Sequence, residues 1–360
     1  RGSIFQSTSD TETILQLVAQ SERKQIVDKL IDALFQIHGA YSLVILTNKK
    51  LIGVRDPYGI RPLVLGDLNG APVLASETCA LDIIGAKFVR EIENGEIIII
   101  SEKGMESIRP FPKVAERPCI FERIYFSRPD SMLGGNTVYT YRKNLGIELA
   151  KEHQVDADIV VPVPDSGVPA ALGYAQQSNT PFELGIIRNH YVGRTFIEPS
   201  QSIRQFGVKL KHNANVSYIK NKKIILIDDS IVRGTTAKKI IKMIYDAGAK
   251  EVHLGIACPP IKHPDFYGVD TPDYNELIES KNSIEEISKT IGSKSLFFLS
   301  IESTYRAMGY ENRNPDQPQF TDHCFTGEYP TSLIDREKGN ISKQFSLLTC
   351  LLYTSDAADE

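Results

Sequence analysis

Hydrophobic and polar positions follow two different rhythms along the chain, and the change falls about one third of the way from its start. Before that point, residues 26–35 carry apolar side chains on one helical stripe, which ends near His38 and Gly39. Short β-type runs follow at residues 41–46, 51–55, 63–65, 73–75 and 97–100, with a short helix expected at 79–84. Closely spaced strands with few helices predict a sheet-rich sandwich with flanking helices.

From about Cys119 onward, strand-like and helix-like segments alternate. Short apolar strands are predicted at residues 159–163, 183–187, 224–227 and 252–257, and helices at 169–177 and 236–246. This order is typical of βαβ units that form a mainly parallel sheet. Farther on, Pro272 marks an expected helix start, and Ser283 with Glu286 predicts the capping box of a helix that Gly292 closes.

The Pro-rich stretch at residues 109–118 separates the two rhythms, and we place a domain boundary there. We therefore divide the chain into a first domain at 1–115, a second at 116–312, a C-terminal extension at 313–345 and a tail at 346–360. The tail continues no periodic pattern, is uninformative for the fold, and need not be native. The chain starts at Arg1 rather than at Met, and both of its ends read as cut.

Composition narrows the class of protein. With 41% hydrophobic and 24% charged residues among 360, the chain can bury a core and needs no explanation as a disordered protein. Its formal charge of −4 argues against a nucleic-acid partner, and no apolar run approaches the roughly 20 residues that cross a membrane. The five scattered cysteines form no CxxC pair, so we expect free thiols in a reducing cytoplasm.

One segment carries most of the chemical information. Residues 224–236 read IILIDDSIVRGTT, an apolar strand that delivers two carboxylates, Asp228 and Asp229, to the carboxyl end of a parallel sheet. The following loop contains Gly234, Thr235 and Thr236 and opens a helix, whose backbone N–H groups can hold a phosphate together with the hydroxyls. Two carboxylates beside that phosphate suit the vicinal hydroxyls of a sugar and a hydrated Mg²⁺. The pattern predicts a ribose-5-phosphate pocket rather than an acidic surface turn.

A Walker A nucleotide loop is excluded, because the chain contains no Gly-Lys dipeptide. The segment at 224–236 instead resembles the signature with which type I phosphoribosyltransferases bind phosphoribosylpyrophosphate (PRPP). Three more stretches narrow the resemblance: YFSRPDS at 125–131, RNHYVGRTFI at 188–197 and VRDPYGIRPLVLG at 54–66. Together they are similar to the glutamine PRPP amidotransferase family over nearly the whole chain, up to about Pro330.

This resemblance implies a fold and a reaction. Members of the family join a class II glutamine amidotransferase domain, an N-terminal-nucleophile (Ntn) sandwich, to a type I phosphoribosyltransferase domain with a mainly parallel sheet and flanking helices. The first domain hydrolyses glutamine, and the ammonia displaces pyrophosphate from C1 of PRPP in the second to give 5-phosphoribosylamine. This is the first committed step of purine synthesis. A basic, water-excluding site that works with Mg²⁺ is expected, because pyrophosphate leaves with a large negative charge.

Residue by residue, the resemblance assigns most of the site to the second domain. It implies a pyrophosphate loop at Asp165, Ser166 and Gly167, and Mg²⁺ positions at Ser166, Asp228 and Asp229. The 5-phosphate would be held by residues 230–236, among them Ser230, Arg233, Gly234, Thr235 and Thr236.

Residues 188–211 match the flexible catalytic loop of the family. The resemblance assigns catalytic roles to Arg188, Tyr191 and Arg194, and PRPP contacts to Lys209 and Lys211. The residues themselves also favour a lid over a solvated basic face, because this long connector has weak periodicity and several basic side chains. Arg188 stands where bacterial members often have Lys, and His190 where they often have Arg, so we expect loop closure to survive in an altered form.

The first domain is recognisable but, by the same resemblance, incomplete. The glutaminase reaction needs an N-terminal Cys whose own α-amino group is the base, whereas this chain begins with Arg1 and has no cysteine before Cys79. TSDTE at residues 8–12 matches the segment in which Asp10 would bind the glutamine α-amino group, although Asp10 taken alone would be read as a helix cap. We therefore expect this polypeptide to use free ammonia rather than glutamine.

Some members of the family hold an iron–sulfur cluster with four cysteines. Here Cys119 and Cys324 occupy two matching positions, while Asp265 and Thr321 stand at the other two. Because two thiolates cannot ligate a cubane that needs four, we expect no cluster.

Two other functions share the PRPP loop. A salvage phosphoribosyltransferase would use a nucleobase, but it would lack the first-domain stretches at 8–12 and 56–66. A PRPP-sensing regulator would need a DNA-binding module and a basic face, and the sequence contains neither. The family resemblance further implies feedback inhibition by purine nucleotides and a homodimer or homotetramer, with no nucleic-acid or membrane partner.

Overall fold

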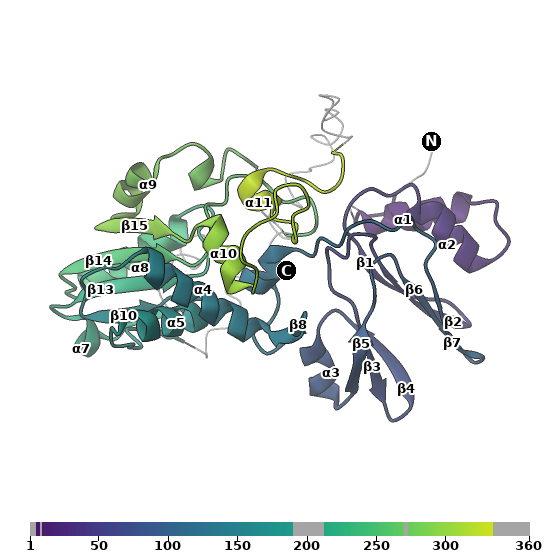
Figure 1. Ribbon diagram of the computed structural model, residues 1–360, viewed down its shortest axis with the longest axis horizontal. Coiled ribbons are helices and arrows are strands. Elements are labelled where there is room, and N and C mark those ends of the chain that lie inside the picture. Colours follow the sequence, from purple (N-terminus) through teal and green to yellow (C-terminus); the bar gives the residue numbers. More distant parts are fainter. Residues whose placement is uncertain (1–4, 8, 190–211, 270–272, 334–360) are drawn as a thin grey trace.

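The computed structural model describes residues 5–7, 9–189, 212–269 and 273–333 (Figure 1). Within this part of the chain, the strands up to Ile108 form antiparallel sheets, whereas a four-stranded parallel sheet is built from strands between Ile159 and Phe298, and Figure 1 shows the two parts side by side. Both predicted fold classes are therefore confirmed. No helix in the described part of the chain has the length and hydropathy of a membrane-spanning segment.

The first domain packs two antiparallel sheets with three helices. Helices α1 (Thr11–Gln20) and α2 (Ile26–Leu34) precede a sheet of order β1-β2-β6-β7, made of β1 (Ser42–Leu46), β2 (Lys50–Arg55), β6 (Ile97–Ser101) and β7 (Gly104–Ile108). A second sheet of order β4-β3-β5 contains β3 (Val64–Leu68), β4 (Ala71–Ala75) and β5 (Lys87–Glu91), with α3 (Thr78–Ile84) beside it.

Strand β6 lies between two hydrophobic layers, because successive side chains of a strand face opposite sides of the sheet. Ile97 and Ile99 join the cluster that contains Leu30 of α2, whereas Ile98 joins Leu63 and its neighbours at the second sheet. All three isoleucines are almost completely buried. This arrangement is the sandwich with flanking helices that the sequence predicted.

The second domain is built on a parallel sheet of order β10-β13-β14-β15. Its strands are β10 (Ile159–Pro162), β13 (Lys223–Asp228), β14 (Glu251–Ile256) and β15 (Ser295–Phe298), and its longer helices are α4 (Val138–Glu152), α5 (Val168–Ser178), α8 (Thr235–Asp246), α9 (Ile284–Ile291) and α10 (Ile301–Ala307). Shorter elements are the π-helix η1 (Glu122–Phe126), β8 (Met132–Leu133), β9 (Asn136–Thr137), β11 (Ile186–Arg188), β12 (His212–Ala214), α7 (Val216–Ile219), the 3₁₀-helix η3 (Ile278–Ser280) and α11 (His323–Thr326). The buried centres of β10, β13 and β14 are typical of parallel strands covered on both faces.

Helices α4 and α5 approach each other closely at two glycines. A Cβ on Gly146 would lie 1.8 Å from the carbonyl oxygen of Ala170, and one on Gly173 would lie 1.9 Å from that of Lys143. No side chain fits at either point, so the two helix backbones touch. This contact fixes α5, which begins directly after the loop at residues 163–167.

The strand predicted at residues 183–187 forms only at residues 186–188 and does not join the parallel sheet. Phe182 makes only an isolated parallel bridge with Val160, and β11 pairs with β12 as an antiparallel ribbon outside the parallel sheet. The chain turns between these points, where the N–H of Gly185 donates to the carbonyl oxygen of Glu183. This turn ends the pairing with β10 before a full edge strand can form.

The predicted helix start at Pro272 lies outside the described residues. The residues from 273 onward form a turn and the short η3, and the next α-helix is α9. There the predicted capping box is confirmed: the hydroxyl of Ser283 accepts from the N–H of Glu286, whose carboxylate accepts from the N–H of Ser283. Gly292 ends the helix in the left-handed conformation, as the sequence indicated.

Candidate functional site

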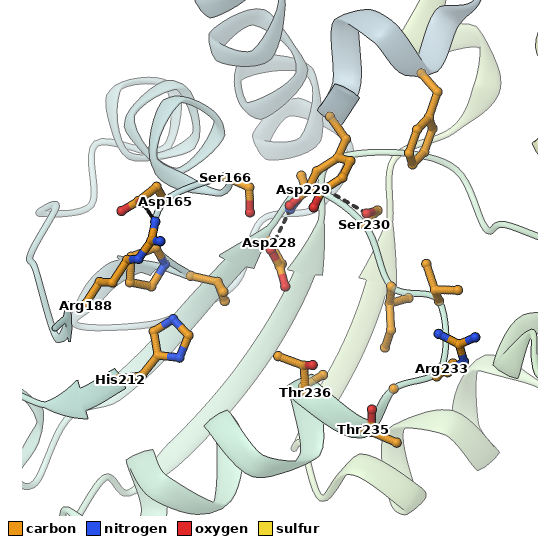
Figure 2. Close-up of a pocket in the computed structure, with 18 of the residues that line it drawn as sticks. Asp165, Ser166, Arg188, His212, Asp228, Asp229, Ser230, Arg233, Thr235 and Thr236 are labelled. Carbon is orange, nitrogen blue, oxygen red and sulfur yellow. Dashed lines mark hydrogen bonds and ion pairs between the residues drawn. The ribbon is translucent and has the colours of Figure 1, made fainter. Parts of the chain in front are cut away.

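A cavity of about 650 Å³ opens at the carboxyl ends of β10 and β13, the edge of the sheet where α/β folds bind ligands (Figure 2). Its wall combines the loop after β10, the loop between β13 and α8, the β11–β12 ribbon and part of η1 with the residues around it. The lining residues are Phe121, Tyr125, Val163, Pro164, Asp165, Ser166, Arg188, His212, residues 228–237 and Val269.

Two neighbouring carboxylates form the polar floor of this cavity. The buried apolar strand β13 ends at Asp228, and the N–H of Asp229 donates to the Asp228 carboxylate at 3.0 Å. The hydroxyl of Ser230 donates to the Asp229 carboxylate at 2.7 Å, and the Asp229 side chain is buried. Burial, and then the nearby Asp229 carboxylate, raise the pKa of Asp228 well above its ordinary value. Such a pair favours a ligand that brings hydroxyl donors or a hard divalent cation.

The start of α8 forms a phosphate cradle next to the carboxylates. Gly234 precedes the helix with φ of +72°, a conformation that an L-residue with a side chain rarely adopts. The free N–H groups of the first turn and the hydroxyls of Thr235 and Thr236 line the cavity at this point. Arg233 also lies at the wall, but its guanidinium forms an exposed ion pair with Glu276 at 2.7 Å and so does not approach the carboxylates.

The loop after β10 closes the opposite side of the cavity. Ser166 points toward the two carboxylates, and Asp165 forms an ion pair with Arg188 at the end of β11 (Figure 2). The peptide bond between Pro164 and Asp165 is cis. Gly167 does not line the cavity: its N–H donates to the carbonyl oxygen of Val163, and a Cβ on it would lie 2.4 Å from the carbonyl oxygen of Ile227.

The structure therefore brings most of the predicted site residues together around one cavity. Ten predicted residues line one cavity: Asp165, Ser166, Arg188, Asp228, Asp229, Ser230, Arg233, Gly234, Thr235 and Thr236. Tyr191, Arg194, Lys209 and Lys211 lie outside the described residues, as does His190. Asp10 lies in the first domain, where it precedes α1 without a side-chain capping bond.

Sequence reasoning missed several lining residues. Tyr125 belongs to the segment YFSRPDS at residues 125–131, but the sequence of that segment predicted no role in the site for this side chain. In the structure, burial and the charges of Asp229 and Asp228 raise its pKa, so its ring lies close to the carboxylate pair. His212 pairs with Arg188 across the β11–β12 ribbon, and only this pairing brings it to the cavity.

Comparisons with known proteins agree with this geometry. A family model described as a glutamine amidotransferase domain matches residues 1–82, and one described as a phosphoribosyl transferase domain matches residues 142–289. An amidophosphoribosyltransferase of Rhizobium etli is 58% identical over 353 residues, which are 96% of this chain and 71% of that relative. The chain belongs to the amidophosphoribosyltransferase family.

Other members of the amidophosphoribosyltransferase family give the same picture. The Bacillus subtilis member is 47% identical over 92% of this chain and 70% of its own length, and a chloroplastic member from Glycine max is 51% identical over 91% and 57%. A solved structure described as glutamine PRPP amidotransferase from B. subtilis complexed with ADP and GMP has a TM-score of 0.85 at 46% identity, covering 92% of this chain and 72% of that one. The chain thus spans between 57% and 72% of these relatives. The predicted family and fold are confirmed.

The four positions compared above with cluster ligands, Cys119, Asp265, Thr321 and Cys324, lie together. Cys119 forms a β-bridge with Thr321, and Cys119, Asp265 and Cys324 line a cavity of only about 10 Å³. The Asp265 carboxylate lies 2.6 Å from Nε2 of His323, which also lines this cavity. Within the described residues, no group of three or more His, Cys, Asp or Glu side chains could hold a metal ion.

Proposed function

We propose that this chain catalyses the PRPP-dependent half of the amidophosphoribosyltransferase reaction, in which ammonia displaces pyrophosphate to give 5-phosphoribosylamine. One observation supports the proposal above all. The Asp228–Asp229 pair and the cradle at Gly234, Thr235 and Thr236 line the same cavity, with the loop at Asp165 and Ser166 on its other side. PRPP needs all three parts: the cradle for its 5-phosphate, the carboxylate pair for its ribose and the loop for its pyrophosphate.

Each part of the cavity has a role in this proposal. The N–H groups and hydroxyls of residues 230–236 hold the 5-phosphate at the positive end of the α8 dipole. Asp228 and Asp229 accept from the ribose hydroxyls, and with Ser166 they face the Mg²⁺ that enters with PRPP as part of the substrate. Asp165, Ser166 and the backbone beside Gly167 surround the pyrophosphate. Ribose donors or a cation would favour the ionised form of Asp228 and so oppose the rise in its pKa.

In this proposal Arg188 exchanges Asp165 for the pyrophosphate of PRPP as its partner. In the described structure its guanidinium is paired with Asp165 at the mouth of the cavity. We propose that the pyrophosphate of PRPP replaces Asp165 as the partner of Arg188, so that ligand binding and movement of the ribbon are linked. Tyr191, Arg194, Lys209 and Lys211 are proposed to join Arg188 around PRPP, by resemblance to the family.

The chemical step breaks the bond between C1 and the pyrophosphate oxygen and forms a bond between C1 and nitrogen. The electron pair of the broken bond leaves with pyrophosphate, and the attacking ammonia loses one proton to become the amine. The charge that develops on the leaving group is best met by Mg²⁺ and basic side chains in a site from which water is excluded.

In the complete reaction we propose glutamine as the source of ammonia, with Asp10 binding its α-amino group. For a polypeptide of residues 1–360 by itself we propose ammonia-dependent but not glutamine-dependent synthesis, without an iron–sulfur cluster. We also propose a cytoplasmic homodimer or homotetramer that purine nucleotides inhibit. The B. subtilis amidotransferase was solved as a complex with ADP and GMP, which supports nucleotide binding in the family.

The experiment measures pyrophosphate release from PRPP with Mg²⁺ and ammonium, comparing three forms of residues 1–360. Replacing both carboxylates, as Asp228→Asn with Asp229→Asn, should lower kcat/KM at least about 100-fold. Asp156→Asn is the matched control. Asp156 forms an exposed ion pair with Lys223, which begins β13, whereas Asp228 ends the same strand. Equal activity of the double variant and this control would refute the proposed role of the carboxylate pair.

A further inference from the structure

The stretch at residues 54–66 belongs to the first domain, yet one of its side chains, Arg61, reaches into the second domain. Its turn is held by Asp56, a fully buried carboxylate that accepts from the N–H groups of Tyr58 at 3.0 Å and Ile60 at 3.1 Å. Backbone bonds extend from the same turn across the junction, since the carbonyl oxygen of Ile60 accepts from the N–H of Cys119 at 3.0 Å. The turn therefore presents Arg61 in one fixed position.

Arg61 contacts two separate segments of the second domain. Its Nη1 donates to the Glu122 carboxylate at 2.7 Å, and its guanidinium stacks over the Phe126 ring at 4.9 Å. Its Nε donates to the carbonyl oxygen of Tyr267 at 2.8 Å, and its Nη2 lies 3.9 Å from the Asp265 carboxylate. Both carboxylates and the guanidinium are buried, with side-chain exposures of 5%, 3% and 11%.

These two segments supply part of the wall of the PRPP cavity. Tyr125 lies between Glu122 and Phe126 on η1, and Val269 follows Tyr267 by two residues; both line the cavity, whereas Arg61 does not. The N–H of Val269 also donates to the Asp265 carboxylate. Without the guanidinium, two buried carboxylates would lose a partner, and the segments that carry Tyr125 and Val269 would shift to regain water or another donor.

We propose that Arg61 is a positioning residue through which the first domain sets the PRPP-facing wall of the second. This inference rests on the proposed function. It gives the first domain a part in the PRPP reaction that does not depend on glutamine, because the contacts of Arg61 exist in the described residues without any glutaminase chemistry. The planar fork of arginine is required, since one side chain serves a carboxylate, a carbonyl oxygen and an aromatic ring at once.

The test uses Arg61→Met and Arg61→Lys in residues 1–360, with ammonium as the nitrogen donor. We expect the KM for PRPP to rise at least about tenfold in Arg61→Met, because the wall that carries Tyr125 and Val269 would shift. The change in kcat should be much smaller, because Arg61 does not touch the carboxylate pair or the phosphate cradle. Arg61→Lys keeps the charge but not the fork, and should give an intermediate KM. The matched control is Arg90→Met, which breaks a two-bond ion pair with Glu96 wholly inside the first domain and should leave the KM unchanged.

An unchanged KM in Arg61→Met, or an equal rise in Arg90→Met, would overturn the proposal. If Arg61→Met fails to fold, Arg61→Lys decides in the same way: a raised KM supports the proposal and an unchanged one overturns it. Calorimetric binding of PRPP to the same variants separates this inference from the proposed function. Tight PRPP binding without ammonia-dependent turnover in the unaltered chain would refute the function alone, whereas equally tight binding by Arg61→Met would refute the positioning role.

Discussion

A buried carboxyl group beneath the phosphate cradle provides a sharp test of the packing. Glu279 lies on η3, and its side chain is buried. Its neighbour Ile278 supports the cradle: the N–H of Ile278 donates to the carbonyl oxygen of Val232, and its side chain packs beside Gly234. Burial raises the pKa of Glu279 to about 9, with the backbone at Ile261 and the charge of Lys262 opposing the effect.

This pKa predicts a stability that falls as the pH rises. Between pH 7 and pH 9 the unfolded chain has already lost this proton, because an ordinary glutamate has a pKa of 4.5, whereas the folded protein still holds it. The folded state therefore binds one proton more, and its stability falls by about 1.4 kcal/mol per pH unit. Over these two units the loss from this one group is roughly 2 kcal/mol, because the folded group is already half ionised at pH 9, and the loss ends once the pH passes the folded pKa.

The perturbation is Glu279→Gln, which keeps the shape and removes the titration. Because the chain has no tryptophan, unfolding by urea is best followed by circular dichroism at pH 7 and pH 9. The free energy of unfolding of the unaltered protein should fall by roughly 2 kcal/mol more than that of the variant across this range. Glu285→Gln, at an exposed position of α9, should behave as the unaltered protein does. Parallel pH profiles for Glu279→Gln and the unaltered protein would refute the reasoning.

Two glycine substitutions test other parts of the account. Gly146→Ala would push its Cβ into the carbonyl oxygen of Ala170, so we expect a loss of at least about 3 kcal/mol in stability, measured by thermal unfolding, and a small loss would show that α4 and α5 separate easily. Gly234→Ala would strain the left-handed backbone and press on Ile278, so we expect at least about a tenfold weaker affinity for PRPP by calorimetry; unchanged affinity would remove Gly234 from the cradle.

Local signals in the sequence predicted the parts of the fold whose periodicity was strong. The apolar run before Asp228 became the buried β13, and the box at Ser283 and Glu286 became the cap of α9. Sequence reasoning missed α4, the longest helix, because its stripe is interrupted by Arg142 and Gly146, both of which are buried for reasons of tertiary contact. Arg142 donates to the carbonyl oxygens of Arg123 on η1 and of Ser127 directly after it, partners that no local pattern reveals.

The candidate site divides in the same way. Asp228 ends β13 and Thr235 begins α8, so both could be placed from the sequence, because the strand and the helix on either side of their loop were predicted. Tyr125, Val269 and His212 reach the cavity only through the folding of distant segments around it. The contact of Arg61 with Glu122 spans 61 positions and depends on how the two domains meet, so neither its existence nor its role was visible in the sequence.

The central claim is that this protein transfers the phosphoribosyl group of PRPP to ammonia. The most direct measurement is pyrophosphate release by residues 1–360 with PRPP and Mg²⁺, using ammonium, glutamine, adenine or hypoxanthine as the only nitrogen source. The account predicts release with ammonium alone. Release that requires adenine or hypoxanthine would instead show a salvage phosphoribosyltransferase, and release with glutamine would contradict the ammonia-only activity proposed for this polypeptide. No release with any of the four would contradict the proposed reaction itself.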